Sequence, residues 1–153
     1  TGMRLSEAAG LSTDDLVLDA DIPYVLVKPH PWRRLKTSAS HRKIPLVGMS
    51  LWAAKQIKER QNSSFCFPRY TNDKHCNANS ASAALNKWLK TVGDKTDVIH
   101  AFRHSFRDRL RAAQVLSELI DQLGGWSLQT IGQGYGDGYP IQTCHEAMVK
   151  ALE

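Results

Sequence analysis

The composition is that of a basic, soluble, globular domain. The chain has 153 residues, of which 42% are hydrophobic and 23% charged, and 20 Lys and Arg outnumber 15 Asp and Glu to give a net charge of +5. This length suits one domain with a single hydrophobic core. No segment is long and apolar enough to span a membrane. The positive charge favours a polyanionic partner, of which nucleic acid is the commonest.

The first third of the chain predicts a short helix followed by two strands. The helix is expected over residues 3–9, and turn and capping residues follow at 11–15. Residues 22–27 are rich in β-forming side chains, and residues 41–47 are a second strand candidate. We therefore expect a hairpin or a small antiparallel sheet, whose connection carries the basic sequence Trp-Arg-Arg-Leu-Lys-Thr at 32–37.

The remaining chain is predicted to be helical, because apolar residues recur at helical spacing. Gly124 and Gly125 provide a C-terminal cap for one of these helices. The fold class that follows is α+β and mainly helical, with a small antiparallel sheet in the N-terminal part. The helices are expected over residues 50–60, 80–92, 98–113, 116–123 and 141–151.

Three cysteines do not form a recognisable metal site. Cys76 follows His75 and Cys144 precedes His145, whereas Cys66 stands apart. Structural zinc needs close pairs of ligands on both sides of a loop, and these spacings do not provide them. We expect three reduced thiols and no bound metal.

The sequence His-Ala-Phe-Arg at residues 100–103 is a candidate phosphate grip. An i, i+3 spacing places His100 and Arg103 on one helix face, and Ala101 and Phe102 are expected to turn toward the core. Arginine offers a bidentate fork with permanent charge, and histidine can move a proton near pH 7. For this motif alone, a solvated basic face is the simpler interpretation.

Three other segments carry side chains suited to DNA chemistry. Arg4 follows a glycine, with Glu7 one helical turn later, which is either a surface ion pair of little energetic value or a buttressed phosphate-binding arginine. Lys36 is placed at the tip of the predicted hairpin, where it can reach a DNA groove. Trp126 follows two glycines, and Tyr135 stands between glycines, so nothing bulky hides its hydroxyl.

The order of these segments resembles the catalytic domain of the tyrosine recombinases, the integrase family of phages and mobile elements. Residues 1–7 (Thr-Gly-Met-Arg-Leu-Ser-Glu) are similar to its first arginine box, 100–106 to its second, and Leu-Gly-Gly-Trp-Ser at 123–127 to its third. Tyr135 falls at the family's usual distance from the third box. Trp126 departs from the histidine that is usual there. The likeness runs from residue 1 to about 150.

The resemblance implies a site-specific recombinase that integrates or excises a mobile element through a 3′-phosphotyrosine intermediate, without cofactor or metal. Residues 1–153 would be the catalytic domain, without the family's core-binding domain. The implied partners are double-stranded DNA at attachment sites, a homo-tetramer on that DNA and accessory DNA-bending proteins of the host, in the cytoplasm with the nucleoid. The catalytic residues would be Arg4, Lys36, His100, Arg103, Trp126 and Tyr135.

Four alternatives stay open at this point. Lys28 competes with Lys36 as the catalytic lysine, and Tyr139 competes with Tyr135 as the nucleophile. A catalytically inactive, DNA-binding relative of an integrase would also carry the basic helix at 98–113. The helix at 141–151 packs either on a neighbouring subunit, as the resemblance implies, or on its own domain.

Overall fold

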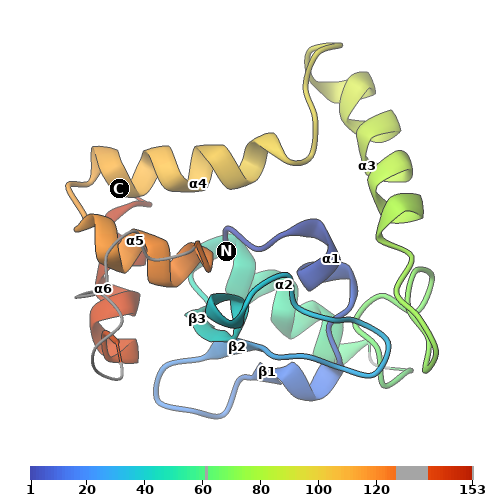
Figure 1. Ribbon diagram of the computed structural model, residues 1–153, viewed down its shortest axis with the longest axis horizontal. Coiled ribbons are helices and arrows are strands. Elements are labelled where there is room, and N and C mark those ends of the chain that lie inside the picture. The colour runs from blue at the N-terminus through green and yellow to red at the C-terminus, as the bar shows by residue number, and fades with distance from the viewer. Residues whose placement is uncertain (61, 127–137, 153) are drawn as a thin grey trace.

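The computed structural model describes residues 1–60, 62–126 and 138–152, and these form a mainly helical domain with one small sheet (Figure 1). The predicted fold class is confirmed. In the described part of the chain the helices are α1 (Leu5–Ala9), α2 (Gly48–Glu59), α3 (Ala78–Val92), α4 (Ala101–Ala112), α5 (Ser117–Gly124) and α6 (Ile141–Lys150). The strands are β1 (Leu16–Val17), β2 (Tyr24–Val27) and β3 (Arg42–Pro45).

The sheet is antiparallel, in the order β1-β2-β3. Val25 lies opposite Leu16 on one side and Ile44 on the other, and Val27 lies opposite Arg42. The predicted pairing of β2 with β3 is therefore confirmed. Strand β1 was not predicted, because a strand of two residues is too short to show the two-residue alternation of a half-buried strand.

The connection between β2 and β3 is a folded excursion rather than a simple hairpin tip. His30 and Arg33 exchange backbone hydrogen bonds of 2.9 and 3.1 Å across a tight turn. Further along, a short 3-10 helix at Ser38–Ser40 leads into β3. This second turn brings the connection back to the sheet, beside the start of α1.

The core lies between the sheet and the helices that follow it. Val25, Val27 and Ile44 of the sheet meet Leu110 of α4 and Leu123 of α5, and all five are fully buried. Fully burying such a side chain contributes about 1.5–3 kcal/mol, so this cluster holds α4 and α5 against the sheet.

Helix α6 packs on its own domain in this structure. Its Cys144 and Met148 are buried in the same core as Ile44 of β3. Figure 1 shows α5 and α6 together beneath the C-terminal end of α4. Residues 141–151 could pack on a neighbouring subunit or on their own domain, and in this structure the helix packs on its own domain.

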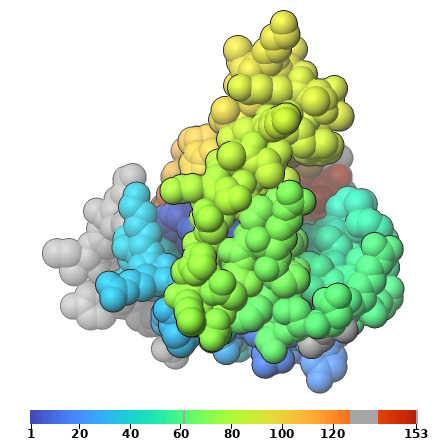
Figure 2. All heavy atoms as spheres, turned by 90° about the vertical axis from the view of Figure 1, so that its right-hand side faces the viewer, coloured from blue at the N-terminus to red at the C-terminus, as the bar shows by residue number. Residues whose placement is uncertain are grey.

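Helix α3 stands out from the body of the domain. Figure 2 shows its segment rising as a ridge to the connection with α4. Ala81 and Leu89 face inward, whereas Trp88 and Val92 are 54% and 64% exposed. Among the described residues, no helix combines the length and the apolar character needed to cross a bilayer.

Candidate active site

Arg4 is fixed at the start of α1 by a buried acid. Its backbone N–H donates to Glu7 Oε2 at 2.9 Å, and its Nη1 donates to Glu7 Oε1 at 2.8 Å. Glu7 is only 2% exposed. The interpretation as a surface ion pair is therefore wrong, because a buried carboxylate holds its partner through desolvated, charge-assisted hydrogen bonds.

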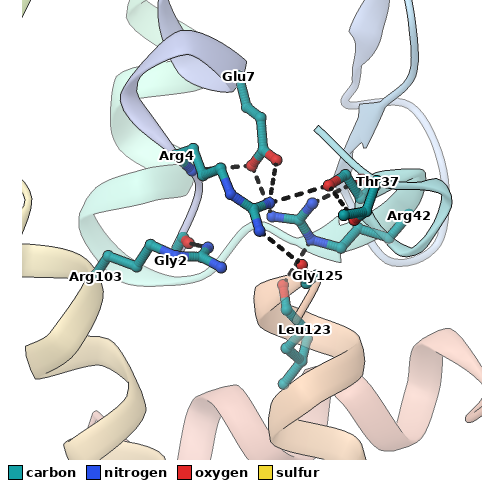
Figure 3. A network of polar contacts seen from close by, with 9 residues as sticks. Gly2, Arg4, Glu7, Thr37, Arg42, Arg103, Leu123 and Gly125 are labelled. Atoms are coloured by element: carbon teal, nitrogen blue, oxygen red, sulfur yellow. Dashed lines mark hydrogen bonds and ion pairs between the residues drawn. The ribbon is translucent and has the colours of Figure 1, made fainter. Parts of the chain in front are cut away.

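The guanidinium of Arg4 also joins two distant parts of the chain. Its Nη1 donates to Ser40 Oγ at 3.0 Å, and its Nη2 donates to the Gly125 carbonyl at 3.1 Å (Figure 3). Arg4 thus links the start of α1, the β2–β3 connection and the end of α5. Arginine has five N–H donors, so these bonds leave donors for a ligand.

Arg103 is the second arginine of the candidate site. It is 5% exposed, and its Nη1 donates to the Gly2 carbonyl, which ties α4 to the segment before α1. Burial, followed by repulsion from Arg4, lowers the pKa of Arg103 to about 10, so it stays charged at neutral pH. Its buried Nη2 has no hydrogen-bond partner among the described residues.

The inward-facing residue of this motif differs from the prediction. We expected Ala101 and Phe102 to turn toward the core, but Phe102 is 59% exposed and Arg103 is the buried residue. Buried arginine normally has partners that offset its desolvation. The Gly2 carbonyl supplies one of these, and Trp126 packs against the same guanidinium.

Trp126 packs its ring against two arginines. The guanidinium carbon of Arg103 lies 4.1 Å from the indole centroid, and that of Arg107 lies 4.7 Å away. Cation–π contacts of this kind stabilise a charge that is partly removed from water. Arg107 also bonds Asp121 at 3.1 Å. The tryptophan therefore stiffens the arginine cluster.

The two positions before Trp126 require glycine for different steric reasons. Gly125 ends α5 in the left-handed conformation, with φ of 63°, and the N–H of Trp126 bonds the Asp121 carbonyl, which is the Schellman pattern. A Cβ on Gly124 would lie 1.6 Å from the Trp126 ring. The predicted C-terminal cap is confirmed, and the Gly-Gly-Trp order is what folds the indole back over the helix end.

His100 lies at the start of α4 and is exposed. Its ring meets that of His104 edge to face, with centroids 5.2 Å apart. His100 and Arg103 line one groove, together with Gly2 and Phe106. The structure thus places the histidine beside the same groove as the buried arginine, on its solvent side.

The two candidate lysines have different surroundings. Lys36 is exposed, in the part of the β2–β3 connection that leads to Ser40 and hence to Arg4. Lys28 follows β2, and its Nζ lies 3.5 Å from the buried carboxylate of Asp15. Lys28 is thus engaged with a structural acid, whereas Lys36 is exposed.

The candidate nucleophile Tyr135 lies outside the described residues. Its competitor Tyr139 is described, and its hydroxyl donates to Glu118 at 3.3 Å. Partial desolvation and the Glu118 carboxylate raise the pKa of Tyr139. Gln122 holds its backbone through bonds of 2.8 and 2.9 Å. Tyr139 is therefore fastened to α5, with a hydroxyl that is harder to ionise than usual.

Arg42 is a residue of this network that the sequence analysis did not find. It is buried at the start of β3 and bonds Glu7 Oε2 at 2.9 Å, the Ser40 carbonyl at 2.7 Å and the Leu123 carbonyl at 2.8 Å. The sequence feature that could have indicated Arg42 is a basic residue at a strand position that faces the core.

In the part of the chain that the structure describes, no three His, Cys, Asp or Glu side chains come together as a metal site. Burial raises the pKa of the Cys66 thiol to about 12 and that of Cys144 to about 11. Both thiols are therefore protonated near neutral pH.

Replacing Gly125 by alanine should destabilise the fold more than the same change at Gly48. Both glycines have left-handed backbones, with φ of 63° and 49°. A Cβ on Gly125 would lie 2.5 Å from Arg42 Nη1, whereas one on Gly48 would meet Leu152 Cδ1 at 3.1 Å. We expect urea unfolding to show a loss of about 2–4 kcal/mol for Gly125→Ala and about 1 kcal/mol for Gly48→Ala. Equal losses would contradict the packing of Arg42 against this turn.

Known proteins with similar sequences identify the family to which these features belong. Residues 1–139 match the description "Phage integrase family". The chain belongs to the phage integrase family. This integrase-family chain is 30% identical over 135 residues to tyrosine recombinase XerC of Neisseria meningitidis serogroup B (strain ATCC BAA-335 / MC58), covering 85% of this chain and 42% of that protein.

A second relative gives the same measure of similarity. Tyrosine recombinase XerC of Neisseria gonorrhoeae (strain ATCC 700825 / FA 1090) is 30% identical over 135 residues, which is 85% of this chain and 41% of that protein. This integrase-family chain thus spans about two fifths of the length of these relatives. No solved structure matches it.

Proposed function

We propose that this chain is the catalytic domain of a tyrosine-type site-specific recombinase, which cleaves and rejoins DNA through a phosphotyrosine link. The observation that supports it best is the convergence of the three boxes. Arg4 bonds the Gly125 carbonyl of the third box, and Arg103 of the second box bonds the Gly2 carbonyl of the first. Segments about 100 residues apart are thereby joined around two arginines.

The arginine cluster suits a phosphodiester in its transition state. Arg4 and Arg103 would bind the non-bridging oxygens and stabilise the negative charge that builds on them. Electrostatic stabilisation of this kind is usually the largest single contribution to catalysis. Trp126 would hold the Arg103 guanidinium in place and donate its indole N–H to an oxygen. The Nη2 of Arg103, which is buried without a hydrogen-bond partner among the described residues, supports this role.

The chemistry would proceed by in-line displacement. The Tyr135 oxygen attacks phosphorus while the bond from phosphorus to the 5′ oxygen breaks, giving a 3′-phosphotyrosine and a 5′-hydroxyl. His100 would accept or orient the tyrosine proton, and Lys36 would protonate the leaving oxygen. A 5′-hydroxyl from a second duplex then reverses these steps. The phosphodiester energy is kept in the covalent link, so no nucleotide is consumed.

In the cell, the recombinase would integrate or excise a mobile element as a homo-tetramer bound to attachment sites, with DNA-bending proteins as accessories. The relatives are named as tyrosine recombinases and are more than twice as long as the matched segment, which supports a further DNA-binding region in the whole protein. The second candidate is an inactive DNA-binding relative. It is favoured by the basic surface of α4, where Arg111 is 60% exposed.

The test uses the full-length protein and a nicked duplex that carries the recombination site. A nick near the cleavage point lets the short 5′-hydroxyl product diffuse away, so that the covalent adduct accumulates. We expect a protein–DNA band that survives SDS, a 5′ end that a polynucleotide kinase can label, and a 3′ end blocked by a tyrosyl peptide after proteolysis. Tight DNA binding without any adduct would favour the inactive relative.

Replacing Lys36 by alanine should slow cleavage about 100-fold, because the leaving 5′ oxygen loses its proton donor. A substrate with sulfur at that bridging position should restore the rate, since a thiolate leaves without protonation. Single-turnover cleavage of both substrates measures this.

Lys28→Ala is the matched control for the lysine assignment. It should leave cleavage of the oxygen substrate little changed, because Lys28 pairs with Asp15. A defect that sulfur rescues in Lys28→Ala, and not in Lys36→Ala, would assign the proton donor to Lys28.

A further inference from the structure

Arg42 lies where the first box and the third box meet. Its side chain is only 4% exposed, and its Nη2 bonds Glu7 Oε2 at 2.9 Å. The same carboxylate receives the backbone N–H of Arg4, and its other oxygen receives Arg4 Nη1. Arg42 and Arg4 therefore share one buried acid, which sets their positions relative to each other (Figure 3).

The rest of the Arg42 guanidinium faces the end of α5. Nε donates to the Leu123 carbonyl at 2.8 Å, and Nη1 donates to the Ser40 carbonyl at 2.7 Å. The backbone of Gly125 passes so close that a Cβ there would lie 2.5 Å from Nη1. These contacts fix the turn that presents Gly125 to Arg4 and carries Trp126 over Arg103.

We propose that Arg42 is a positioning residue for strand cleavage, which couples the Arg4 grip, through Glu7, to the turn at Leu123–Gly125. The inference deepens the proposed function and rests on it. Arg42 is too buried to meet DNA, so it acts through its neighbours. Lysine cannot replace it fully, because a single ammonium group cannot reach the carboxylate and both carbonyls in the geometry of a planar fork.

The expected defect is in rate and not in DNA affinity. Small displacements of a positioning network can cost about 100-fold in rate. We expect Arg42→Gln to lower single-turnover cleavage about 100-fold and Arg42→Lys about 10-fold, each with the dissociation constant for DNA little changed. The matched control is Arg33→Gln. Arg33 is also buried but lies in the β2–β3 connection, and its guanidinium has no hydrogen-bond partner among the described residues.

The pH profile separates positioning from simple loss of stability. Burial of Glu7 opposes its ionisation, but the bonds from Arg42 and Arg4 outweigh burial and hold the pKa of this carboxyl below its usual value. Arg33 and Arg103 add weaker attraction from the β2–β3 connection and from α4. Without Arg42 the carboxylate loses its strongest partner while burial is unchanged, so the pKa of Glu7 rises and cleavage by Arg42→Gln should fall off at a higher pH than cleavage by the unsubstituted protein.

A measurement independent of activity uses the urea midpoint. The ionised Glu7 contributes stability above its unfolded pKa, and this contribution is lost as pH falls through the lower folded pKa. The midpoint difference between the unsubstituted protein and Arg42→Gln should therefore grow as pH rises through the unfolded pKa of glutamate, about 4.3. It should become independent of pH when both proteins carry Glu7→Gln.

The experiment uses the full-length protein with the nicked duplex described above, and each variant is assayed below its unfolding transition. Slower cleavage with unchanged DNA binding, a shifted pH profile and partial rescue by lysine support the proposal. Equal cleavage defects in Arg42→Gln and Arg33→Gln, or an unshifted pH profile, would overturn it. Should the unsubstituted protein form no adduct, the proposed function fails and the catalytic role of Arg42 fails with it, while the midpoint series still decides its coupling to Glu7.

Discussion

Tyr135→Phe should abolish the covalent protein–DNA adduct and leave DNA binding little changed. Phenylalanine lacks the attacking oxygen, and removal of a nucleophile typically costs at least about 10⁴-fold in rate. The measurement is the SDS-stable band formed on the nicked duplex, with DNA affinity measured in parallel by gel shift.

Tyr139→Phe is the matched control and should form the adduct normally. The Tyr139 hydroxyl bonds Glu118 in the first turn of α5, whereas Arg4 bonds Gly125 at the other end of that helix. The helix rises 1.5 Å per residue, which separates these two points by roughly 10 Å. Loss of the adduct only in Tyr139→Phe would move the nucleophile to Tyr139, and the recombinase proposal would stand.

Arg103→Ala should lower the rate of cleavage by about 10²–10³-fold, the usual effect of removing a donor to a developing negative charge. Arg103→Lys keeps the charge but loses the planar fork and its packing on Trp126, and it should recover only part of the rate. Single-turnover cleavage at saturating protein measures the chemical step apart from binding.

Arg111→Ala is the control on the same helix. Arg111 is 60% exposed and pairs loosely with Asp108 at 3.8 Å. We expect this variant to weaken DNA binding and flatten its salt dependence, with little effect on cleavage at saturation. An Arg103→Ala protein that cleaves as fast as Arg111→Ala would show that Arg103 has no part in the transition state.

The elements with a strong local pattern were predicted well. Helices α2 to α6 follow from apolar residues that recur at helical spacing, and the pairing of β2 with β3 follows from two segments rich in β-forming residues. Both patterns are properties of the sequence alone. The end of α5 was predictable for the same reason, since Gly125 is favoured wherever a helix closes in the left-handed conformation. The two-residue strand β1 has no such pattern.

Which polar residues are buried was not predictable from local spacing. Arg4 and Glu7 have the spacing of a surface pair, and Phe102 has the apolar character of a core residue. In the structure Glu7 and Arg103 are buried while Phe102 faces solvent. Burial of charge depends on the partners that arrive from elsewhere in the chain, and here these are Arg42 and the Gly2 carbonyl.

The sequence by itself determined the helical elements, the family and the residue types at the candidate site, because these depend on local order and spacing along the chain. Only the tertiary structure decided how that site is held together. Contacts between residues that are far apart in sequence depend on how the elements pack, and Arg42 shows this most clearly. It lies 35 residues from Glu7 and 81 residues from Leu123, yet its guanidinium bonds both.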